Sequence, residues 1–448
     1  LPENMPMLVW QLALENRGPS PIQVQSLDLL RIGEGLPGRM RSPGSTLKLH
    51  TEPGNYGFFS NGWQSWSYTG AYQASQRARS TRLGPVQAPM CSNPETPRMT
   101  RAGRYTSDFF GVIGDRTHRR GALAGFLSQK QHFGSLDAWL QGSPGVRMWA
   151  NGDQAVLHPG NILYTDWAAL NFLDLDDPDP FAAYVEAVAR ENAATFRAST
   201  PVGWCSWYHF YTNVTAQHIE QNLSAIQSVH DRLPLDLVQI DDGFESHVGD
   251  WFSFKPTFPE GVAPLAKRIQ ESGLTPGLWL APFILHPAAQ LVRDHPDYVL
   301  RTRLGVPVNA GFVWNVFTTA LDLTHPGALD YACRVVETAS KEWGFPYLKL
   351  DFLYAAALPG WHIDRTRTRA QVLRSALEAL RRVVGPETTL LGCGVPLGSA
   401  IGLFDATRIG ADVSGDWEPR YFNVGLPFRG EPAMPSASNA IQNMLTRA

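Results

Sequence analysis

Cysteine is scarce in this 448-residue sequence, which has only Cys91, Cys205, Cys333 and Cys393. Their number and spacing argue against a disulfide framework and a zinc motif, so we expect a reducing compartment, the cytoplasm. An excess of either charge is also lacking, because 38 Lys and Arg residues face 41 Asp and Glu residues. This balance argues against a nucleic-acid partner and against a polybasic contact with a membrane.

Long apolar runs and nucleotide motifs are missing as well. No run of about 18 uncharged apolar residues occurs, so no membrane-spanning helix is predicted. The start, LPENMPMLVW, has neither the charged region nor the apolar core of a signal peptide, but it does not begin with Met, so secretion stays open as an alternative. Neither a GxGxxG nor a Walker loop follows any predicted strand, and no metal-ligand spacing is present. The sequence thus predicts no cofactor and no metal.

Tryptophan, by contrast, is abundant, with 14 residues among 11% aromatics. Such a content is high for a core alone. It is typical of a site that grips a flat, partly apolar ligand, and sugars fit that description.

The chain divides into two differently patterned parts. Residues 1–175 predict a β-sandwich, because short alternating runs are separated by Gly, Pro, Asn and Asp. These runs are VWQLAL, IQVQSLDLLRI, STLKLHT, GALAGFLS, VRMWA, AVLHPG and NILYTDWAAL. Residues 176–200 predict a linker with a helix. From residue 201 to 448 strands and helices alternate, which indicates either a doubly wound sheet or a (β/α)₈ barrel. We prefer the barrel, since the nucleotide signature of the alternative is missing.

Charged and aromatic residues gather at the carboxyl ends of the six predicted barrel strands, where such barrels carry their catalytic groups. The strands are VGWCSWY, LDLVQID, TPGLWLAP, YLKLDF, TLLGCGVP and ATRIGADV. They end, in order, with Trp204 and Trp207; Asp241 and Asp242; Trp279; Lys349 and Asp351; Cys393; and Arg408 and Asp412. Each group alone has a structural explanation as a turn, a core residue, an ion pair or a cation site. Because all these groups lie at the same end of successive strands, the pattern favours a catalytic site.

Two carboxylates on different strands suggest glycoside hydrolysis, in which one attacks the anomeric carbon and the other protonates the leaving oxygen. Lys349 shares a strand face with Asp351 and favours its ionised form, which makes Asp351 the better nucleophile. The general acid would be Asp412, four residues beyond Arg408 on the same predicted strand face. The neighbouring Asp241 and Asp242 can accept hydrogen bonds from adjacent sugar hydroxyls.

The chain resembles the bacterial α-galactosidases of glycoside hydrolase family 36 in their shorter form. The matching motifs are NGWQSW (61–66), GWCSWYHF (203–210), QIDDGF (239–244), GDW (249–251), PGLWLAPF (276–283), YLKLDFLYAAALPG (347–360), LGCGVPL (391–397) and RIGAD (408–412). The resemblance implies a β-supersandwich before a (β/α)₈ barrel and a retaining mechanism. It also implies a galactoside or an oligosaccharide of the melibiose or raffinose type as substrate, and it leaves open whether the protein is a homo-oligomer. It implies that Asp351 is the nucleophile and Asp412 the acid/base. The residues that it places in the galactose pocket are Trp66, Trp207, Asp241, Asp242, Trp279, Lys349, Cys393 and Arg408.

The sequence departs from the family pattern in two places. It stops where the sixth barrel helix is expected, so we expect the last barrel strands and the C-terminal β-domain to be missing from this chain, and six strands cannot close such a barrel. Asp416 offers a competing carboxylate, although RIGAD aligns on Asp412.

Three other functions stay open. The first two share the same carboxylates: an α-N-acetylgalactosaminidase, which the small Gly394 and Val395 permit, and a galactosyl transferase of the raffinose-synthase type. The third is a carbohydrate-binding protein without catalysis.

Overall fold

The computed structural model describes residues 7–33, 51–97, 99–141, 144–195, 201–421, 426–427 and 429–447. The predicted strand STLKLHT lies outside these ranges except for its last residue, Thr51. Within them, no helix combines the length and the apolar character that a membrane crossing requires.

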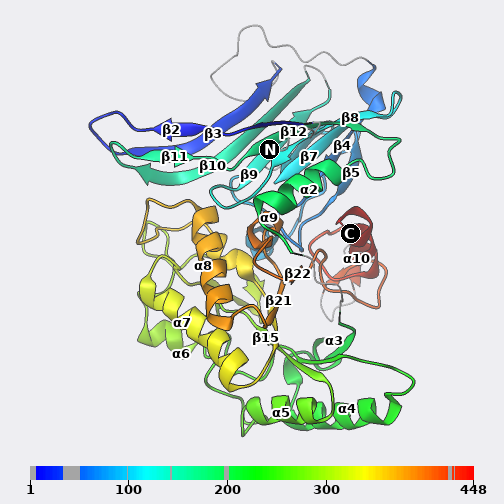
Figure 1. The fold of residues 1–448 in the computed structure, drawn as a ribbon, viewed down its shortest axis with the longest axis vertical. Coiled ribbons are helices and arrows are strands. Elements are labelled where there is room, and N and C mark those ends of the chain that lie inside the picture. The colour runs from blue at the N-terminus through cyan, green and yellow to red at the C-terminus, as the bar shows by residue number, and fades with distance from the viewer. Residues whose placement is uncertain are drawn as a thin grey trace.

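The N-terminal part is a sandwich of two antiparallel sheets, as predicted (Figure 1). The first has the order β1 (Met7–Trp10), β12 (Ala168–Asp174), β8 (Arg120–Phe126), β7 (Phe110–Asp115), β4 (Tyr56–Ser60) and β5 (Gly70–Gln73). The second has the order β3 (Ile22–Ile32), β10 (Gly145–Leu157), β9 (Gly134–Trp139) and β6 (Arg104–Asp108), and β2 (Ala13–Glu15) pairs with β11 (Ile162–Tyr164). Residues of β4 alternate between buried and half-buried positions, which places Phe58 in the core between the sheets.

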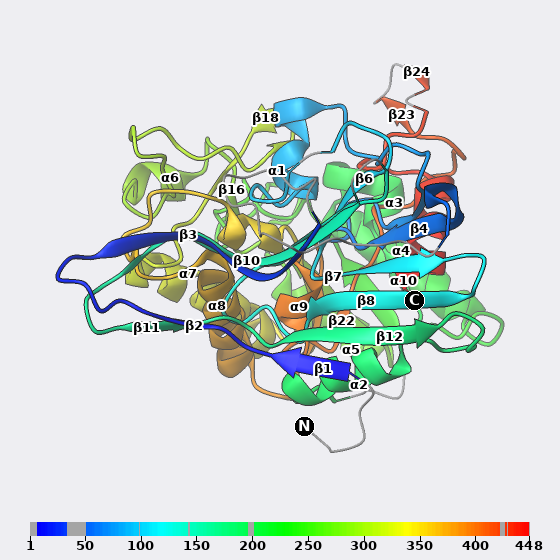
Figure 2. The same cartoon turned by 90° about the horizontal axis from the view of Figure 1, so that it is seen from above.

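Helix α2 (Ala182–Glu191) follows the last sandwich strand and packs on the sandwich. Tyr184 is buried on its inner face and donates a hydrogen bond to the carbonyl oxygen of Phe126 at 2.6 Å. Seen from above, the helix lies along the sheet beside β1 and β12 (Figure 2).

The C-terminal part is built on a six-stranded parallel sheet, as the alternating pattern predicts. Its order is β13 (Gly203–Cys205), β14 (Leu237–Ile240), β15 (Thr275–Leu280), β20 (Tyr347–Leu350), β21 (Thr389–Gly392) and β22 (Ala406–Thr407). The long helices are α4 (Ala216–Val229), α5 (Ala263–Glu271), α7 (Pro326–Glu337) and α8 (Arg369–Val384), which lie along the outer side of the strands (Figure 1). The described strands therefore form part of a barrel wall, with strand neighbours in sequence order.

Two details differ from the prediction. Strand β22 ends at Thr407, so Arg408 and Asp412 lie in the loop beyond it and do not share a strand face. Trp207 begins the short helix α3 (Trp207–Phe210) instead of ending a strand. Both differences arise because a strand ends where its neighbour no longer supplies hydrogen bonds, which a single sequence does not record.

The last described helix, α10 (Ala437–Arg447), returns to the sandwich. The hydroxyl of Thr446 donates a hydrogen bond to the carbonyl oxygen of Thr69 at 3.3 Å, directly before β5. Figure 1 shows this helix below the sandwich and to one side of β22. The loop of residues 61–69 is thus held by both parts of the chain.

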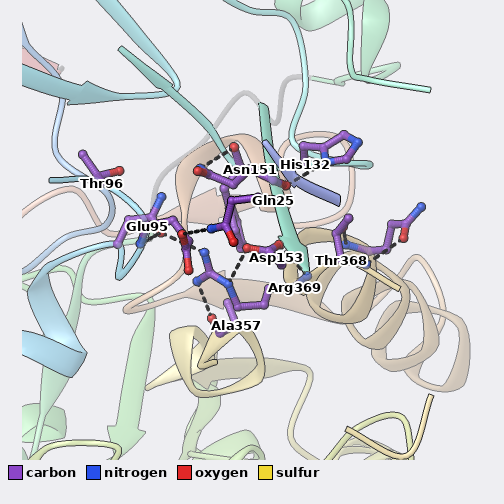
Figure 3. A network of polar contacts seen from close by, with 12 residues as sticks. Gln25, Glu95, Thr96, His132, Asn151, Asp153, Ala357, Thr368 and Arg369 are labelled. Atoms are coloured by element: carbon purple, nitrogen blue, oxygen red, sulfur yellow. Dashed lines mark hydrogen bonds and ion pairs between the residues drawn. The ribbon is translucent and has the colours of Figure 1, made fainter. Parts of the chain in front are cut away.

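A buried ion pair joins the sandwich to helix α8 (Figure 3). In strand β10 the register shifts between Asn151 and Ala155, and Asp153 has a φ of 54°. Such a bulge redirects a side chain, and here the Asp153 carboxylate reaches the first turn of α8. It accepts hydrogen bonds from the Arg369 backbone nitrogen and from Arg369 Nε, both at 2.9 Å. A carboxylate at this helix end is also favoured by the helix dipole.

The Arg369 guanidinium is satisfied on its other sides too. It donates to the carbonyl oxygen of Ala357 at 2.8 Å and to Oδ1 of Asn93 at 3.0 Å. Since the side chains of Arg369 and Asp153 are only 3% and 4% exposed, neither charge reaches water. The pair therefore depends on its complete set of hydrogen bonds.

Replacement of Arg369 by Met should destabilise the protein, because it leaves the Asp153 carboxylate buried and unpaired. We expect the free energy of unfolding to fall by about 3–5 kcal/mol. A lower midpoint of urea-induced unfolding would measure this loss. Arg382→Met is the matched control, since Arg382 lies exposed on the same helix. Equal effects of the two substitutions would contradict a special role for the buried pair.

Candidate active site

The predicted site residues follow the carboxyl ends of neighbouring strands, so the parallel sheet brings them to one edge. Asp241 and Asp242 come directly after β14, and Trp279 lies in β15 opposite Lys349 of β20. Asp351 and Cys393 are the first residues after β20 and β21. The site is therefore built on rigid strands.

A buried ion pair between Lys349 and Asp241 connects two of these strands. The Nζ atom of Lys349 lies 2.8 Å from Oδ2 of Asp241, and the side chains are 9% and 2% exposed. Burial is the largest single influence and lowers the pKa of Lys349, but the negative groups around it, Asp241 first and then Cys393 and Asp351, together outweigh burial. The pKa therefore stands well above its ordinary value. The lysine therefore carries its charge throughout the physiological range.

This pairing corrects one detail of the prediction. Lys349 was expected to pair with Asp351 on its own strand face, whereas its direct partner is Asp241, on the next strand but one. Asp241 also accepts a hydrogen bond from Nε2 of Gln239 at 2.6 Å. Asp351 interacts with the lysine only through the longer-range attraction of their charges.

Asp351 is oriented by two other groups. Its Oδ2 accepts a hydrogen bond from Nε1 of Trp279 at 3.2 Å, and its Oδ1 accepts one from the backbone nitrogen of Phe352 at 2.7 Å. Phe352 has a φ of 52°, a strained conformation for a bulky residue. The turn that bends the chain after β20 thereby fixes the carboxylate in one orientation.

Arg408 and Asp412 form the second charged pair of the site. Nη1 of Arg408 donates to Oδ1 of Asp412 at 2.5 Å, and Nε1 of Trp207 donates to Oδ2 at 3.3 Å. Burial lowers the pKa of Arg408, but the carboxylate of Asp412, then Cys393 and Asp351, raise it above its ordinary value. Both Asp351 and Asp412 thus lie within electrostatic reach of one guanidinium.

Several donors beside this pair are buried and unused. Among the described residues, Nε and Nη2 of Arg408 and Nε1 of Trp66 have no hydrogen-bond partner. The Arg408 guanidinium lies over the Trp66 ring, 5.4 Å from its centroid. Because buried polar groups are normally paired, these donors indicate a place for a ligand oxygen. The sandwich loop NGWQSW reaches the site at Trp66, while Trp63 is packed in the core against Phe133 and Tyr354.

Cys393 lies among the charged residues but is inert. Burial, opposed by the Arg408 charge, raises the pKa of its thiol to about 12. The thiolate is the reactive form of cysteine, so Cys393 supplies shape and not a nucleophile.

Asp416, the competing carboxylate, points to another partner. Its Oδ1 lies 3.1 Å from Nε of Arg420, and 45% of its side chain is exposed. Asp412 is more buried, at 16%, and contacts both Arg408 and Trp207. The geometry therefore favours Asp412 for a role in the site.

Trp314 belongs to the site and was not predicted. Its Nε1 donates to Oδ2 of Asp242 at 2.6 Å. It stands in the turn between β17 (Phe312–Val313) and β18 (Val316–Phe317), where both Trp314 and Asn315 have positive φ. Alternating apolar residues around a two-residue turn with Asn were a signal for this hairpin, but not for its position beside β14.

Comparisons with known proteins identify related chains. The sequence model of the family described as Melibiase matches residues 183–381. An α-galactosidase of Escherichia coli is 24% identical over 213 residues, which are 46% of this chain and 28% of that protein. The α-galactosidase AgaA of Geobacillus stearothermophilus is 34% identical over 139 residues, 30% of this chain and 18% of that protein. The matched regions thus span less than a third of these curated relatives.

Solved structures match over a larger share. The α-galactosidase TtGalA of Thermus thermophilus, solved with stachyose, is 31% identical, with a TM-score of 0.71, and the match covers 88% of this chain and 77% of that one. Its complex with p-nitrophenyl α-D-galactopyranoside gives a TM-score of 0.73 over 98% of this chain and 79% of that one, at 28% identity. The chain therefore belongs to the melibiase family, the α-galactosidases of glycoside hydrolase family 36.

Proposed function

We propose that the protein is a retaining exo-α-galactosidase, which removes terminal α-linked galactose from oligosaccharides of the melibiose or raffinose type. The observation that carries the proposal is the position of Asp351 and Asp412. They follow different strands, act on the same Arg408, and each accepts a hydrogen bond from a tryptophan. Two carboxyl groups on opposite sides of one sugar position are what glycoside hydrolysis requires.

In the first step Asp351 attacks the anomeric carbon while Asp412 donates its proton to the leaving oxygen. The glycosidic bond breaks, and a covalent bond joins galactose to Asp351. In the second step Asp412, now ionised, takes a proton from water, and the resulting hydroxide displaces Asp351 from the sugar. Arg408 stabilises the ionised Asp412 between the two steps, since the two groups are already paired.

The remaining groups select the sugar. The carboxylates of Asp241 and Asp242 accept hydrogen bonds from adjacent hydroxyl groups, and the Lys349 ammonium donates to them. The free donors of Arg408 and Trp66 bind a further hydroxyl oxygen. A site that depends on so many buried polar groups rejects an epimer that leaves one of them unpaired.

Three further proposals concern the location and the partners of the protein. All four cysteines are free, which supports a cytoplasmic location. TtGalA, with which this chain shares most of its length, was solved with stachyose, and this supports an oligosaccharide as the partner of the site. We also propose a homo-oligomer, on the family resemblance alone.

Hydrolysis of p-nitrophenyl α-D-galactopyranoside tests the function directly. We expect release of nitrophenol from this substrate and not from the corresponding β-galactoside. Preferred hydrolysis of an α-N-acetylgalactosaminide would move the assignment to the related galactosaminidases. Binding of galactose without turnover of any galactoside would indicate a carbohydrate-binding protein.

The two carboxylates should be separable by mutation. Asp351→Asn should lower kcat on the order of 10⁴-fold on every substrate, because the attacking oxygen is lost. Asp412→Asn should lower kcat about 10²- to 10⁴-fold for oligosaccharides, yet spare the first burst of nitrophenol from an activated substrate, which needs no protonation. Burst kinetics of both variants measure this difference. Equal residual rates on the activated substrate would refute the assignment of roles.

Trp66→Ala should raise KM for the galactoside about five- to tenfold with little change in kcat, since it removes one aromatic contact of about 1–1.5 kcal/mol. Trp167→Ala is the control, because Trp167 is exposed elsewhere on the sandwich. Steady-state kinetics of the two variants suffice. An unchanged KM would make Trp66 a core residue without contact to the substrate.

A further inference from the structure

Asp242, a residue of the proposed sugar site, is paired with another acidic residue, Glu245. The carboxyl groups of Asp242 and Glu245 are hydrogen-bonded to each other, and the residues are only 4% and 2% exposed. Ionised carboxylates only accept hydrogen bonds, so such a bond requires a proton on one of the two groups. The pair therefore holds one negative charge and one proton.

The backbone brings these two groups together. Gly243 has a φ of 127°, and a Cβ atom there would come within 3.0 Å of the Thr212 backbone, so the sharp turn after Asp242 favours glycine. Glu245 pairs with Phe254 through a β-bridge, which fixes its direction. Its Oε2 also accepts a hydrogen bond from the backbone nitrogen of Gly243 at 3.3 Å. The turn thus folds Glu245 back onto Asp242.

The charges around the pair place the proton on Glu245. Burial raises the pKa of Glu245 well above its ordinary value, and the negative charge of Asp242 raises it further. Burial also raises the pKa of Asp242, whereas the hydrogen bonds from Glu245 and Trp314 lower it. The other charged groups that act on the pair are Asp241 and Lys255, and the Nζ atom of Lys255 donates to the Thr212 carbonyl at 3.1 Å.

We propose that Glu245 is a positioning residue that stays neutral and donates a hydrogen bond to Asp242, which orients that carboxylate toward the sugar. Trp314 holds Oδ2 of the same carboxylate, so two donors fix its plane. The inference rests on the proposed function, because it assumes that Asp242 binds a sugar hydroxyl. Glu245 itself does not touch the substrate.

This arrangement makes sugar binding depend on pH in one direction. While the proton remains on Glu245, Asp242 keeps its orientation. When Glu245 loses this proton as the pH rises, a second negative charge faces Asp242 and the hydrogen bond becomes a repulsion. Binding of galactose should therefore weaken as the pH rises.

Two measurements on the full chain test the inference, each made on the variants Glu245→Gln and Glu245→Ala. The control is Glu260→Gln, which alters an exposed glutamate on the same connection before α5. The first is the infrared difference spectrum between wild type and each variant at neutral pH, which detects a protonated carboxyl group without any ligand. The second is the Kd of galactose as a function of pH, measured by calorimetry.

We expect the difference spectrum of wild type minus Glu245→Gln to show the loss of one carboxylic acid band, and that of the control to show no such loss. The glutamine amide still donates to Asp242, so its Kd at neutral pH should equal that of wild type, while the weakening with rising pH should disappear. Glu245→Ala, if it folds, should bind about tenfold more weakly at neutral pH, the loss of one hydrogen bond to a charged group.

A difference spectrum of wild type minus Glu245→Gln without the loss of a carboxylic acid band would overturn the inference. So would a weakening of binding with rising pH that persists in this variant. A wild type that binds no galactose at any pH would instead count against the proposed function. In that case the infrared comparison still decides whether the pair shares the proton.

Discussion

The contact between Asp153 and Arg369 is the constraint on which the rest of the structure depends. A bulge in a sandwich strand aims a carboxylate at the first turn of a barrel helix, and the arginine there is bound on every side (Figure 3). Two buried charges are favourable only when all their hydrogen bonds are made, so the contact tolerates one relative position of the two parts. That position brings the loop with Trp66 against Arg408. The sandwich thereby contributes one residue to a site whose other members come from the parallel sheet and the loops that follow its strands.

Tryptophan N–H groups recur in the site as fixed donors. Trp207, Trp279 and Trp314 each donate to a different carboxylate, at Asp412, Asp351 and Asp242. An indole is a rigid donor without charge, so it orients a carboxylate without the strong shift in pKa that a second cation would cause. The cations are placed separately, with Lys349 on Asp241 and Arg408 on Asp412. Part of the high tryptophan content of the sequence thus serves hydrogen bonding within the site.

Much of this arrangement could be predicted from the sequence, because buried parallel strands are continuous apolar runs and their ends are marked by charged residues. The division of the chain into a sandwich part and a parallel-strand part, and the order of the six parallel strands, followed from such local patterns. The partners of side chains across the sheet did not follow from these patterns. Lys349 was paired with its strand neighbour Asp351, although side chains of the next strand but one lie closer, and the hairpin with Trp314 carries no mark of the strand it approaches. Glu245 was passed over because burial, which turns a surface acid into a neutral donor, depends on the folded surroundings.

The central claim, that Asp351 attacks the sugar, is tested most directly by labelling. The folded protein is exposed to a mechanism-based inactivator of galactose configuration, and the labelled peptide is identified by mass spectrometry. The account predicts one label, on Asp351 within YLKLDF, because only an attacking carboxylate forms a lasting bond with such a reagent. A label on Asp412, Asp242 or Asp416 would contradict it.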